Sequence, residues 1–542
     1  MTSVIGRRRP LLAGLVAAVL SAAVVPIAWS EAAGPAGRGA TAVSSAASAA
    51  TPAVAPVRDC GTLTAIDLTG VPEAPSRILS AAPITTSGTT YCDVRGYIAP
   101  QTQFEVKLPV STWHGQYVQD GCGGFCGDVP TEGANPVPQQ ATGCGAVTNG
   151  ELVVASDNEG HVGANRLDGL WGLNEPRLRT VFGYTSEHQL ASVAKTIIHG
   201  YYGQSASHSY YDGCSDGGRE ALIEAQRYPD DFDGILAGAP ALDATDFAGE
   251  LSAWVYRSNT DNQGRQILGT DKLPALHAAV LKACAGPDGI IADPRTCEFD
   301  PATVTCPPNT DAAACLTPAQ VTVVRKFYSG PQDPAGRALY PGGLPYGSEL
   351  AWAGWDISPT GNVLGTNAAQ FAINFLSYLV SDHPAKTDLQ DLTFTDGEYF
   401  KLQQAAAANN STDPDLTAFR RHGGKIILYH GWADQAIPPF GTVAYYNAMT
   451  TQTKDAASFS RLYMIPAQYH CLAGGDPQAS ADLLTPLMNW VTTGSAPGAL
   501  TFPTVNPAPD RPASLTVEPF DPRQKVTGHG ANSDYDWIGR FH

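Results

Sequence analysis

The residues best suited to chemistry surround Ser215. The run YDGCSDGGRE contains this serine between Gly213 and Gly217, in a Gly-x-Ser-x-Gly pattern. Such a pattern is typical of a sharp turn between a strand and a helix that holds a serine hydroxyl out as a nucleophile. The flanks agree, because residues 207–211 are typical of a short strand and residues 220–227 of a helix. In a chain with 55 glycines the pattern is weak evidence alone, so other residues must support it.

An acid and a base follow the serine in the chain. Asp434 comes shortly after a buried-strand pattern at 425–431, and His470 follows another strand pattern at 461–465. The order Ser, Asp, His is that of the α/β-hydrolases. The sequence therefore predicts that Ser215 attacks an acyl carbon, that His470 takes and returns its proton, and that Asp434 orients the imidazole.

Two cysteines adjoin these residues, since Cys214 precedes the serine and Cys471 follows the histidine. A disulfide between them would tie the nucleophile loop to the base loop and would stabilise the fold by about 5 kcal/mol in the chain-entropy model. This Cys-Ser, Asp, His-Cys arrangement resembles the tannase and feruloyl esterase family, which includes mono-hydroxyethyl terephthalate hydrolases. Segments such as Phe-Gly-Tyr at 182–184 and Ala-Gly-Ala-Pro at 237–240 extend the resemblance over most of residues 57–500.

The resemblance and the strand patterns imply an α/β fold: an α/β-hydrolase core with a large lid domain inserted between the Ser and Asp strands. Alternating patterns at 91–98 and 104–110 predict the antiparallel start of its sheet. The expected divisions are a signal peptide at 1–33, a disordered linker at 34–56, core at 57–241, lid at 242–424, core again at 425–510 and a C-terminal tail at 511–542.

A glycine-dense loop, GCGGFCG at 121–127, lies where this fold needs one half of an oxyanion hole. Glycine lets the backbone approach a substrate closely. We expect one amide from Gly123, in preference to Gly124, and the other from Asp216, the residue after the nucleophile. A plain turn held by a disulfide through a neighbouring cysteine is the alternative, and it is compatible with the first.

The lid carries aromatic residues that could contact a substrate, and a loop with few ligands for a metal ion. Trp352 and Trp355, in a segment that resembles the family's lid, could stack on an aromatic substrate or pack in the lid core. The resemblance also implies calcium bound after Cys284. However, the loop to Cys297 lacks the early carboxylates that a site of six to eight oxygens needs. We therefore expect no metal and no cofactor.

Two other histidines are assigned no catalytic role. His161 precedes the serine, out of order for the base, and we expect it to be a structural hydrogen-bonding residue. His430 lies inside a strand pattern, so we expect it to be buried and satisfied.

Composition limits the class of protein. The 542 residues are 43% hydrophobic, enough for a full core, and the net charge of −18 argues against nucleic acid or an acidic membrane as a partner. Arg7-Arg8-Arg9 followed by the apolar run 11–29 is typical of a secretory signal peptide, by the general or the twin-arginine route. We therefore expect a secreted protein that is not bound to a membrane. No pattern indicates an oligomeric state.

Eleven cysteines in an exported chain predict disulfides with one thiol left over. Cys284 with Cys297, and Cys306 with Cys315, are local candidates that the resemblance also supports. Five N-terminal cysteines allow several pairings: Cys60, Cys92, Cys122, Cys126 and Cys144.

These observations predict a secreted serine esterase that cleaves feruloyl, galloyl or related aromatic esters, either as small molecules or on plant polymers. Terephthalate half-esters or other synthetic aromatic esters are the alternative substrates. An acyltransferase, or a binding protein on a catalytically dead scaffold, is the alternative of another class.

Overall fold

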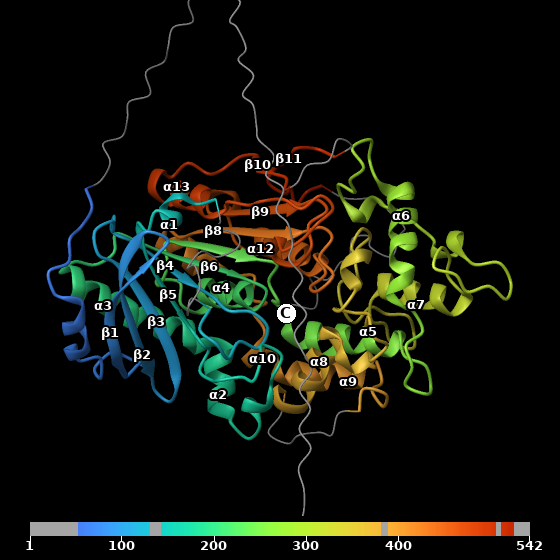
Figure 1. Ribbon diagram of the computed structural model, residues 1–542, viewed down its shortest axis with the longest axis horizontal. Helices are drawn as coiled ribbons and strands as arrows, with labels where there is room; N and C mark the ends of the chain where they lie inside the picture. The colour runs from blue at the N-terminus through green and yellow to red at the C-terminus, as the bar shows by residue number, and fades with distance from the viewer. Residues whose placement is uncertain (1–51, 131–142, 381–387, 506–510, 525–542) are drawn as a thin grey trace, which may run out of the picture. The chain divides into compact units, whose positions relative to one another are not determined.

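The computed structural model describes residues 52–130, 143–380, 388–505 and 511–524 (Figure 1). The predicted signal peptide and residues 34–51 of the predicted linker lie outside these residues. The end of that linker is not free, because the amide of Val54 donates a hydrogen bond to the carbonyl of Trp113 at 2.8 Å.

One mixed sheet organises the described residues. Its nine strands run in the order β1-β2-β3-β5-β4-β6-β7-β8-β9. Strands β1, β2, β3 and β5 pair antiparallel, whereas β5, β4, β6, β7, β8 and β9 pair parallel. The bounds are β1 Ser76–Thr86, β2 Thr89–Ile98, β3 Thr102–Pro109, β4 Gln116–Asp120, β5 Leu152–Asp157, β6 His208–Cys214, β7 Gly234–Gly238, β8 Lys425–Gly431 and β9 Ser460–Ile465. The predicted antiparallel start of the sheet is confirmed, and the rest of the sheet is parallel.

Both faces of the parallel part are buried, which explains its nearly continuous apolar runs. In β8, Ile426 and Leu428 join the core on one face, and Ile427 and Tyr429 join the core on the other. Helices α3 and α12 contribute to the first core and α13 to the second. The helices outside the insertion are α1 Gly145–Thr148, α2 Pro176–Thr180, α3 Ser186–Tyr202, α4 Asp216–Arg227, α12 Phe440–Gln452 and α13 Leu484–Thr493.

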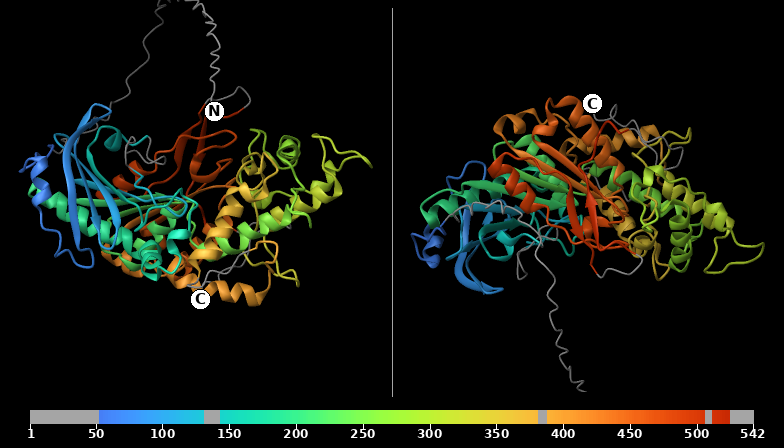
Figure 2. Two further views of the ribbon diagram at one scale, coloured as in Figure 1. Left: turned by 60° about the horizontal axis from the view of Figure 1, so that its bottom comes forward. Right: turned by 90° about the horizontal axis from the view of Figure 1, so that it is seen from above.

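The chain leaves the sheet after β7 and returns at β8. Its helices there are α5 Ser252–Ser258, α6 Leu273–Cys284, α7 Pro318–Ser329, α8 Asn367–Asn374, α9 Asp396–Leu402, α10 Ala406–Asn409 and α11 Thr417–His422. Figure 2 shows most of this insertion, the predicted lid, beside the sheet. It has its own core, which includes Phe327 and Trp352. Leu416 and Phe419 already pack in the core of the sheet, before the predicted boundary at 424.

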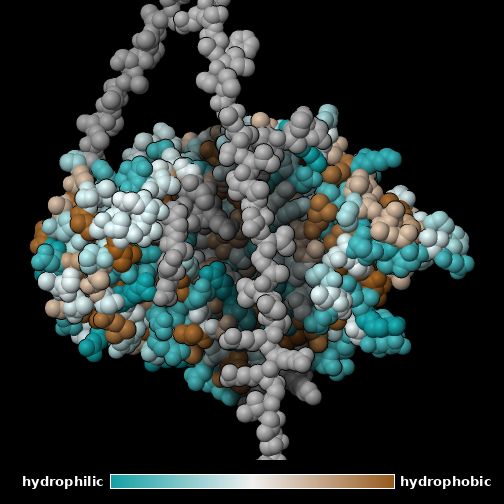
Figure 3. All heavy atoms as spheres, viewed as in Figure 1, coloured by the Kyte–Doolittle hydropathy of each residue, from teal (hydrophilic) through white to brown (hydrophobic). Residues whose placement is uncertain are grey.

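The predicted tail contributes a strand. β11 (Ser514–Val517) pairs antiparallel with β10 (Leu500–Pro503). On the part of the surface that Figure 3 leaves uncovered, hydrophobic residues are scattered among hydrophilic ones. Among the described residues, no helix combines the length and the apolar character needed to cross a membrane.

A buried ionic contact joins the lid to the loop after His470. His277 of α6 places Nδ1 2.7 Å from Glu349 of the lid and Nε2 3.5 Å from Asp476 of that loop. Arg511 contacts the same Asp476 oxygen at 3.0 Å and donates to the carbonyl of Gly289 in the lid. Although burial opposes the charge, the neighbouring carboxylates of Asp476 and Glu349 raise the pKa of His277 to about 9. We call these residues the lid clamp.

The lid clamp makes stability depend on pH. A histidine whose folded pKa is raised contributes stability that is fully present below its unfolded pKa, near 6.5, and is lost as pH rises through about 9. We expect His277→Gln to melt below the wild type at pH 6 and the gap to close by pH 10 in calorimetric scans. His422→Gln, which removes a more exposed ion pair with Asp230, is the control and should change little. A gap at pH 6 no larger than that of the control would contradict a charged His277.

Candidate active site

Ser215 sits in a strained turn between β6 and α4. Its φ of 68° and ψ of −118° are rare for a residue with a side chain. The turn needs glycine on both sides, because a Cβ on Gly213 would lie 2.3 Å from the carbonyl oxygen of Gly217, and one on Gly217 would lie 3.0 Å from that of Cys122. The helix therefore starts directly after the serine, at Asp216, earlier than the apolar pattern from residue 220 predicts.

The three predicted residues meet at the carboxyl ends of β6, β8 and β9. Nε2 of His470 lies 2.9 Å from Oγ of Ser215, and Nδ1 lies 2.8 Å from Oδ2 of Asp434. This is the geometry in which a base can take the serine proton while a carboxylate holds its ring.

Asp434 is fully buried and held from several sides. Its Oδ1 accepts the amides of Ala436 at 2.8 Å and Ile437 at 2.9 Å. Although burial alone would raise the pKa of Asp434, the charges and hydrogen bonds of His470 and His430 hold it well below its usual range. The carboxylate is thus ionised at any working pH and available to a protonated His470.

His430 and His161 have the surroundings expected of structural residues: both are buried and hydrogen-bonded. His430 is fully buried, and its ring contacts the hydroxyl of Thr442 at 2.9 Å and the carbonyl of Ile437 at 2.8 Å. Its Nε2 is also 3.2 Å from Asp434, a contact that no motif signals. His161 contacts the carbonyls of Glu159 and Phe125, and burial lowers its pKa to about 4.

Five disulfides occur among the described residues. Cys214 is bonded to Cys471 with Cα atoms 5.9 Å apart, and the local pairs are Cys284–Cys297 and Cys306–Cys315. The pairings left open by the sequence are Cys60–Cys92 and Cys122–Cys126, with Cys144 as the buried free thiol.

The glycine-dense loop packs over the start of α4. The carbonyl of Cys122 accepts the amide of Gly217 at 2.8 Å. Gly124, with φ +71°, lines a cavity beside Ser215 and Asp216, whereas Gly123 is absent from that cavity's described lining. This placement favours Gly124 over the predicted Gly123 as the loop's donor. The role of either amide stays a prediction.

The cavity beside Ser215 is mainly aromatic and apolar. Its lining comprises Gly124, Phe125, Phe182, Ser215, Asp216, Ala241, Ala244, Phe247, Ala248, Phe371 and Phe375. The rings of Phe125 and Phe371 meet edge to face with centroids 5.1 Å apart. Sequence reasoning did not assign the four phenylalanines outside the 182–184 motif to the cavity, because they come from three distant segments. These are the loop 121–127 with Phe125, the lid residue Phe247, and the pair Phe371 and Phe375, one helical turn apart.

The two predicted tryptophans differ. Trp355 is partly exposed, and its ring centroid lies 5.6 Å from that of His470. Trp352 is fully buried in the lid core, where it packs on Phe327 and donates to the hydroxyl of Ser348 at 2.8 Å. A side chain so enclosed cannot stack on a substrate, so that expectation is wrong for Trp352.

The loop after Cys284 offers little to a metal ion. Oδ1 of Asp288 accepts the amide of Ile290, and the Gly289 carbonyl accepts from Arg511, a cation. Elsewhere, single carboxylate oxygens of Glu159, Glu187 and Glu220 lie within 4.8 Å of one another, fully enclosed. Cys122 and Cys126 lie near this group, but as a disulfide they provide no thiolate ligand.

Taken together, the sheet order, the turn at Ser215 and the three aligned side chains define an α/β-hydrolase. Residues 86–517 match the family described as "Tannase and feruloyl esterase". The chain belongs to this family of carboxylic ester hydrolases, as the resemblance implied.

Similar proteins support this family assignment. A mono(2-hydroxyethyl) terephthalate hydrolase from Piscinibacter sakaiensis is 30% identical over 530 residues, covering 85% of this chain and 86% of the relative. A probable feruloyl esterase B-2 from Aspergillus flavus is 32% identical over 424 residues, covering 73% and 76%. The crystal structure of feruloyl esterase B from Aspergillus oryzae has the same fold, with a TM-score of 0.70 at 24% identity over 85% of this chain and 95% of that one.

The Cys214–Cys471 bond should affect catalysis more than folding. Each cysteine adjoins a residue of the site, so the bond limits the gap between Ser215 and His470. A shift of about 1 Å can cost a hundredfold in rate. We expect the double variant Cys214→Ala/Cys471→Ala to fold and to lose at least tenfold in kcat in a steady-state ester assay.

The double variant Cys306→Ala/Cys315→Ala, which removes a lid disulfide away from the site, is the matched control. Equal losses of kcat in both double variants would show that the bond next to Ser215 has no special effect on the site.

Proposed function

We propose that the protein is a secreted serine esterase that cleaves aromatic esters through an acyl-enzyme, and that the aromatic acyl group of its substrate carries no charge. The observation that carries the proposal is the line Ser215–His470–Asp434, with contacts of 2.9 and 2.8 Å, at the edge of an aromatic cavity. Five disulfides, which persist in oxidising compartments, support secretion.

The steps follow from the geometry. His470 takes the proton of Ser215 as its oxygen attacks the ester carbonyl, and Asp434 stabilises the resulting imidazolium. The amides of Asp216 and of the Gly123–Gly124 turn stabilise the oxyanion, each donor contributing about 3 to 4 kcal/mol in comparable sites. His470 then gives its proton to the leaving alcohol. Water, activated by the same histidine, releases the acid from Ser215.

The lining of the cavity favours an uncharged acyl group. Its described residues include no Lys or Arg, and Asp216 is their only ionisable side chain. A free carboxylate on the acyl group would lose its hydration there without a cation in return. Each phenolic hydroxyl would also need a hydrogen-bond partner. We therefore rank feruloyl esters above galloyl esters, and both above terephthalate half-esters.

Hydrolysis of terephthalate half-esters is a second candidate activity. The relative from Piscinibacter sakaiensis is named as a mono(2-hydroxyethyl) terephthalate hydrolase, which supports terephthalate half-esters as substrates. An acyltransferase would use the same acyl-enzyme and would be recognised by ester products when a second alcohol competes with water.

Ser215→Ala should abolish ester hydrolysis while the melting temperature changes little, because only the hydroxyl is removed. The measurements are hydrolysis of methyl ferulate and labelling by a fluorophosphonate. Control labelling uses the Ser209→Ala variant, which should keep the label. If Ser215→Ala turns over substrate at the wild-type rate, Ser215 is not the nucleophile. If the wild type takes no label, a binding protein is favoured.

A substrate panel tests the acyl group. We expect kcat/KM to fall at least tenfold from methyl ferulate to the mono-methyl ester of terephthalate, and dimethyl terephthalate, which has no free carboxylate, to recover much of that loss. A half-ester that is the better substrate of the pair would contradict the inference from the lining.

We also propose that the enzyme works without a metal. A calcium chelator should leave the melting temperature and kcat unchanged, since a bound ion would stabilise the fold by mass action. A fall in melting temperature with chelator, reversed by added calcium, would show that the loop after Cys284 still binds the ion.

A further inference from the structure

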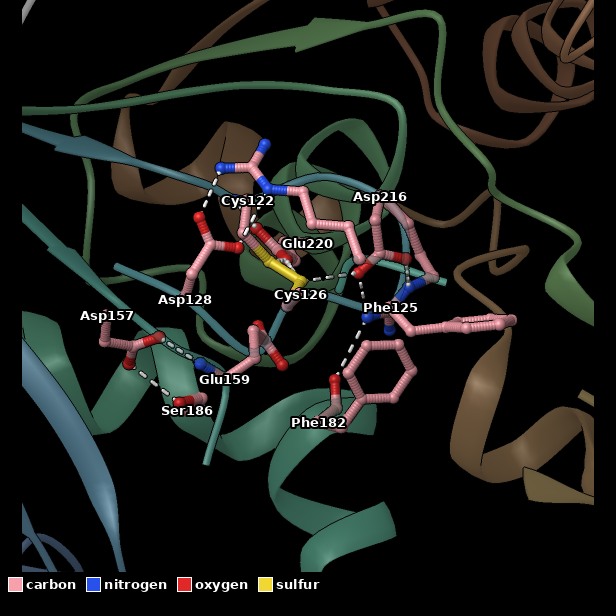
Figure 4. The surroundings of a disulfide bond; sticks show 12 residues. Cys122, Phe125, Cys126, Asp128, Asp157, Glu159, Phe182, Ser186, Asp216 and Glu220 are labelled. Atoms are coloured by element: carbon pink, nitrogen blue, oxygen red, sulfur yellow. Dashed lines mark hydrogen bonds and ion pairs between the residues drawn. A yellow bond between two sulfur atoms is a disulfide. The ribbon is translucent and has the colours of Figure 1, made fainter. Parts of the chain in front are cut away.

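Glu220 is a buried carboxyl group that joins the elbow helix to the glycine-dense loop. It is 2% exposed and lies on α4, just over one turn after Ser215. Its Oε2 accepts the amide of Cys122 at 3.1 Å and the hydroxyl of Tyr211 at 2.6 Å. Its Oε1 lies 3.0 Å from Sγ of Cys122 and 3.6 Å from Sγ of Cys126 (Figure 4).

The contacts of Oε1 favour a protonated oxygen. Cys122 and Cys126 are bonded to each other, so neither sulfur carries a hydrogen. An ionised oxygen would then face sulfur lone pairs at 3.0 Å with no donor between them. A protonated Oε1 instead donates to the sulfur, a weak acceptor. The neutral acid of Glu220 makes each of these contacts favourable.

The surrounding charges agree with a neutral Glu220. Carboxylate oxygens of Glu159, in the loop after β5, and Glu187, on α3, lie within 4.8 Å of one of its oxygens. Burial first, and then the charge of Asp216, raise the pKa of Glu220 well above its usual range, against the opposite effect of Arg219. Further acids around it are Asp157 and Glu224, and Tyr211 of β6 donates to it.

The nearby cations are engaged elsewhere. Arg219 makes two bonds to Asp216, at 2.6 and 2.9 Å, and donates to the carbonyls of Phe182 and Gly183. Arg166 makes two bonds to Asp128, both at 2.8 Å. A negative charge on Glu220 would therefore be a buried charge without a direct ionic partner, which is costly.

We propose that Glu220 keeps its proton at neutral pH and acts as a positioning residue, holding Cys122 so that the amides of the Gly123–Gly124 turn face Ser215. The inference rests on the proposed function, since it assumes that these amides stabilise the oxyanion. Two bonds hold the backbone of Cys122: its amide donates to Glu220, and its carbonyl accepts the amide of Gly217. The first of these is lost when the side chain is removed.

Glutamine distinguishes a neutral acid from a carboxylate, because its amide group donates where the neutral acid donates and accepts where it accepts. We expect Glu220→Gln to keep kcat within about twofold of the wild type at pH 7. Glu220→Ala should lose at least tenfold in kcat with little change in KM. Its affinity for phenylboronic acid, whose adduct with Ser215 mimics the tetrahedral intermediate, should fall by a similar factor.

The pH profile gives a readout that a merely structural role would not move. A carboxyl group with a raised folded pKa contributes stability that is fully present below its unfolded pKa, near 4.3, and is lost as pH rises through the folded value. We therefore expect the melting temperature of Glu220→Gln to rise relative to the wild type between pH 5 and pH 9.

The control is Glu224→Gln, one turn further along α4, where a buried acid makes no contact with Cys122. It should leave kcat and phenylboronic acid binding unchanged. Tyr211→Phe, which removes one hydroxyl bond to Glu220, is a milder variant to use if Glu220→Ala folds poorly. It should lower kcat, by less than the loss expected of Glu220→Ala.

Two outcomes overturn the proposal. If Glu220→Gln is as impaired as Glu220→Ala, then a charge or a bound cation is needed at this position and the proton is misplaced. If Glu220→Ala keeps the kcat of the wild type, the side chain does not position the loop. Failure of the proposed function would be distinct, because either Ser215 of the wild type would resist the fluorophosphonate or Ser215→Ala would still hydrolyse esters.

Discussion

The close approach of α4 to the ends of β6 and β7 is the constraint on which the site depends. Ser215 adopts a positive φ because the chain must reverse within one residue. A side chain at Gly213 would collide with backbone atoms, and one at Gly217 would press against the carbonyl of Cys122. Once this turn is made, the serine hydroxyl stands at the edge of the sheet where β8 and β9 also end. The acid and the base therefore need only short loops to reach it.

Several acids are buried in the interior near the start of α4. Glu159, Glu187, Glu220 and Glu224 are buried around the strand ends, and burial raises the pKa of each. Asp434, on the other side of the serine, is instead kept ionised by two histidines. Buried carboxyl groups of one fold thus differ in charge because their neighbours differ. Asp434, beside His470, and Asp216, paired with Arg219, have cationic partners that the four glutamates lack among the described residues.

The sequence predicts the parts of the site that local pattern determines. Gly-x-Ser-x-Gly requires a particular backbone turn, and a polar residue after a buried strand lies at the end of the sheet, so Ser215, Asp434 and His470 could be named before any coordinates. The four phenylalanines could not, because packing between the lid and the core brings them together. For the same reason Trp352 and Trp355 looked alike, although one fills the lid core and the other borders His470. The partners of Glu220 depend on a disulfide whose pairing was open.

The Cys214–Cys471 bond turns everything between β6 and the base loop, the whole lid included, into a covalently closed ring. The chain can then be cut within that ring without releasing either half. A protease that nicks the lid would leave two polypeptides that still hold Ser215 and His470 next to each other. Damage to the lid, which lines part of the cavity beside Ser215, would therefore not separate Ser215 from His470. A nicked molecule would come apart into fragments only under reducing conditions.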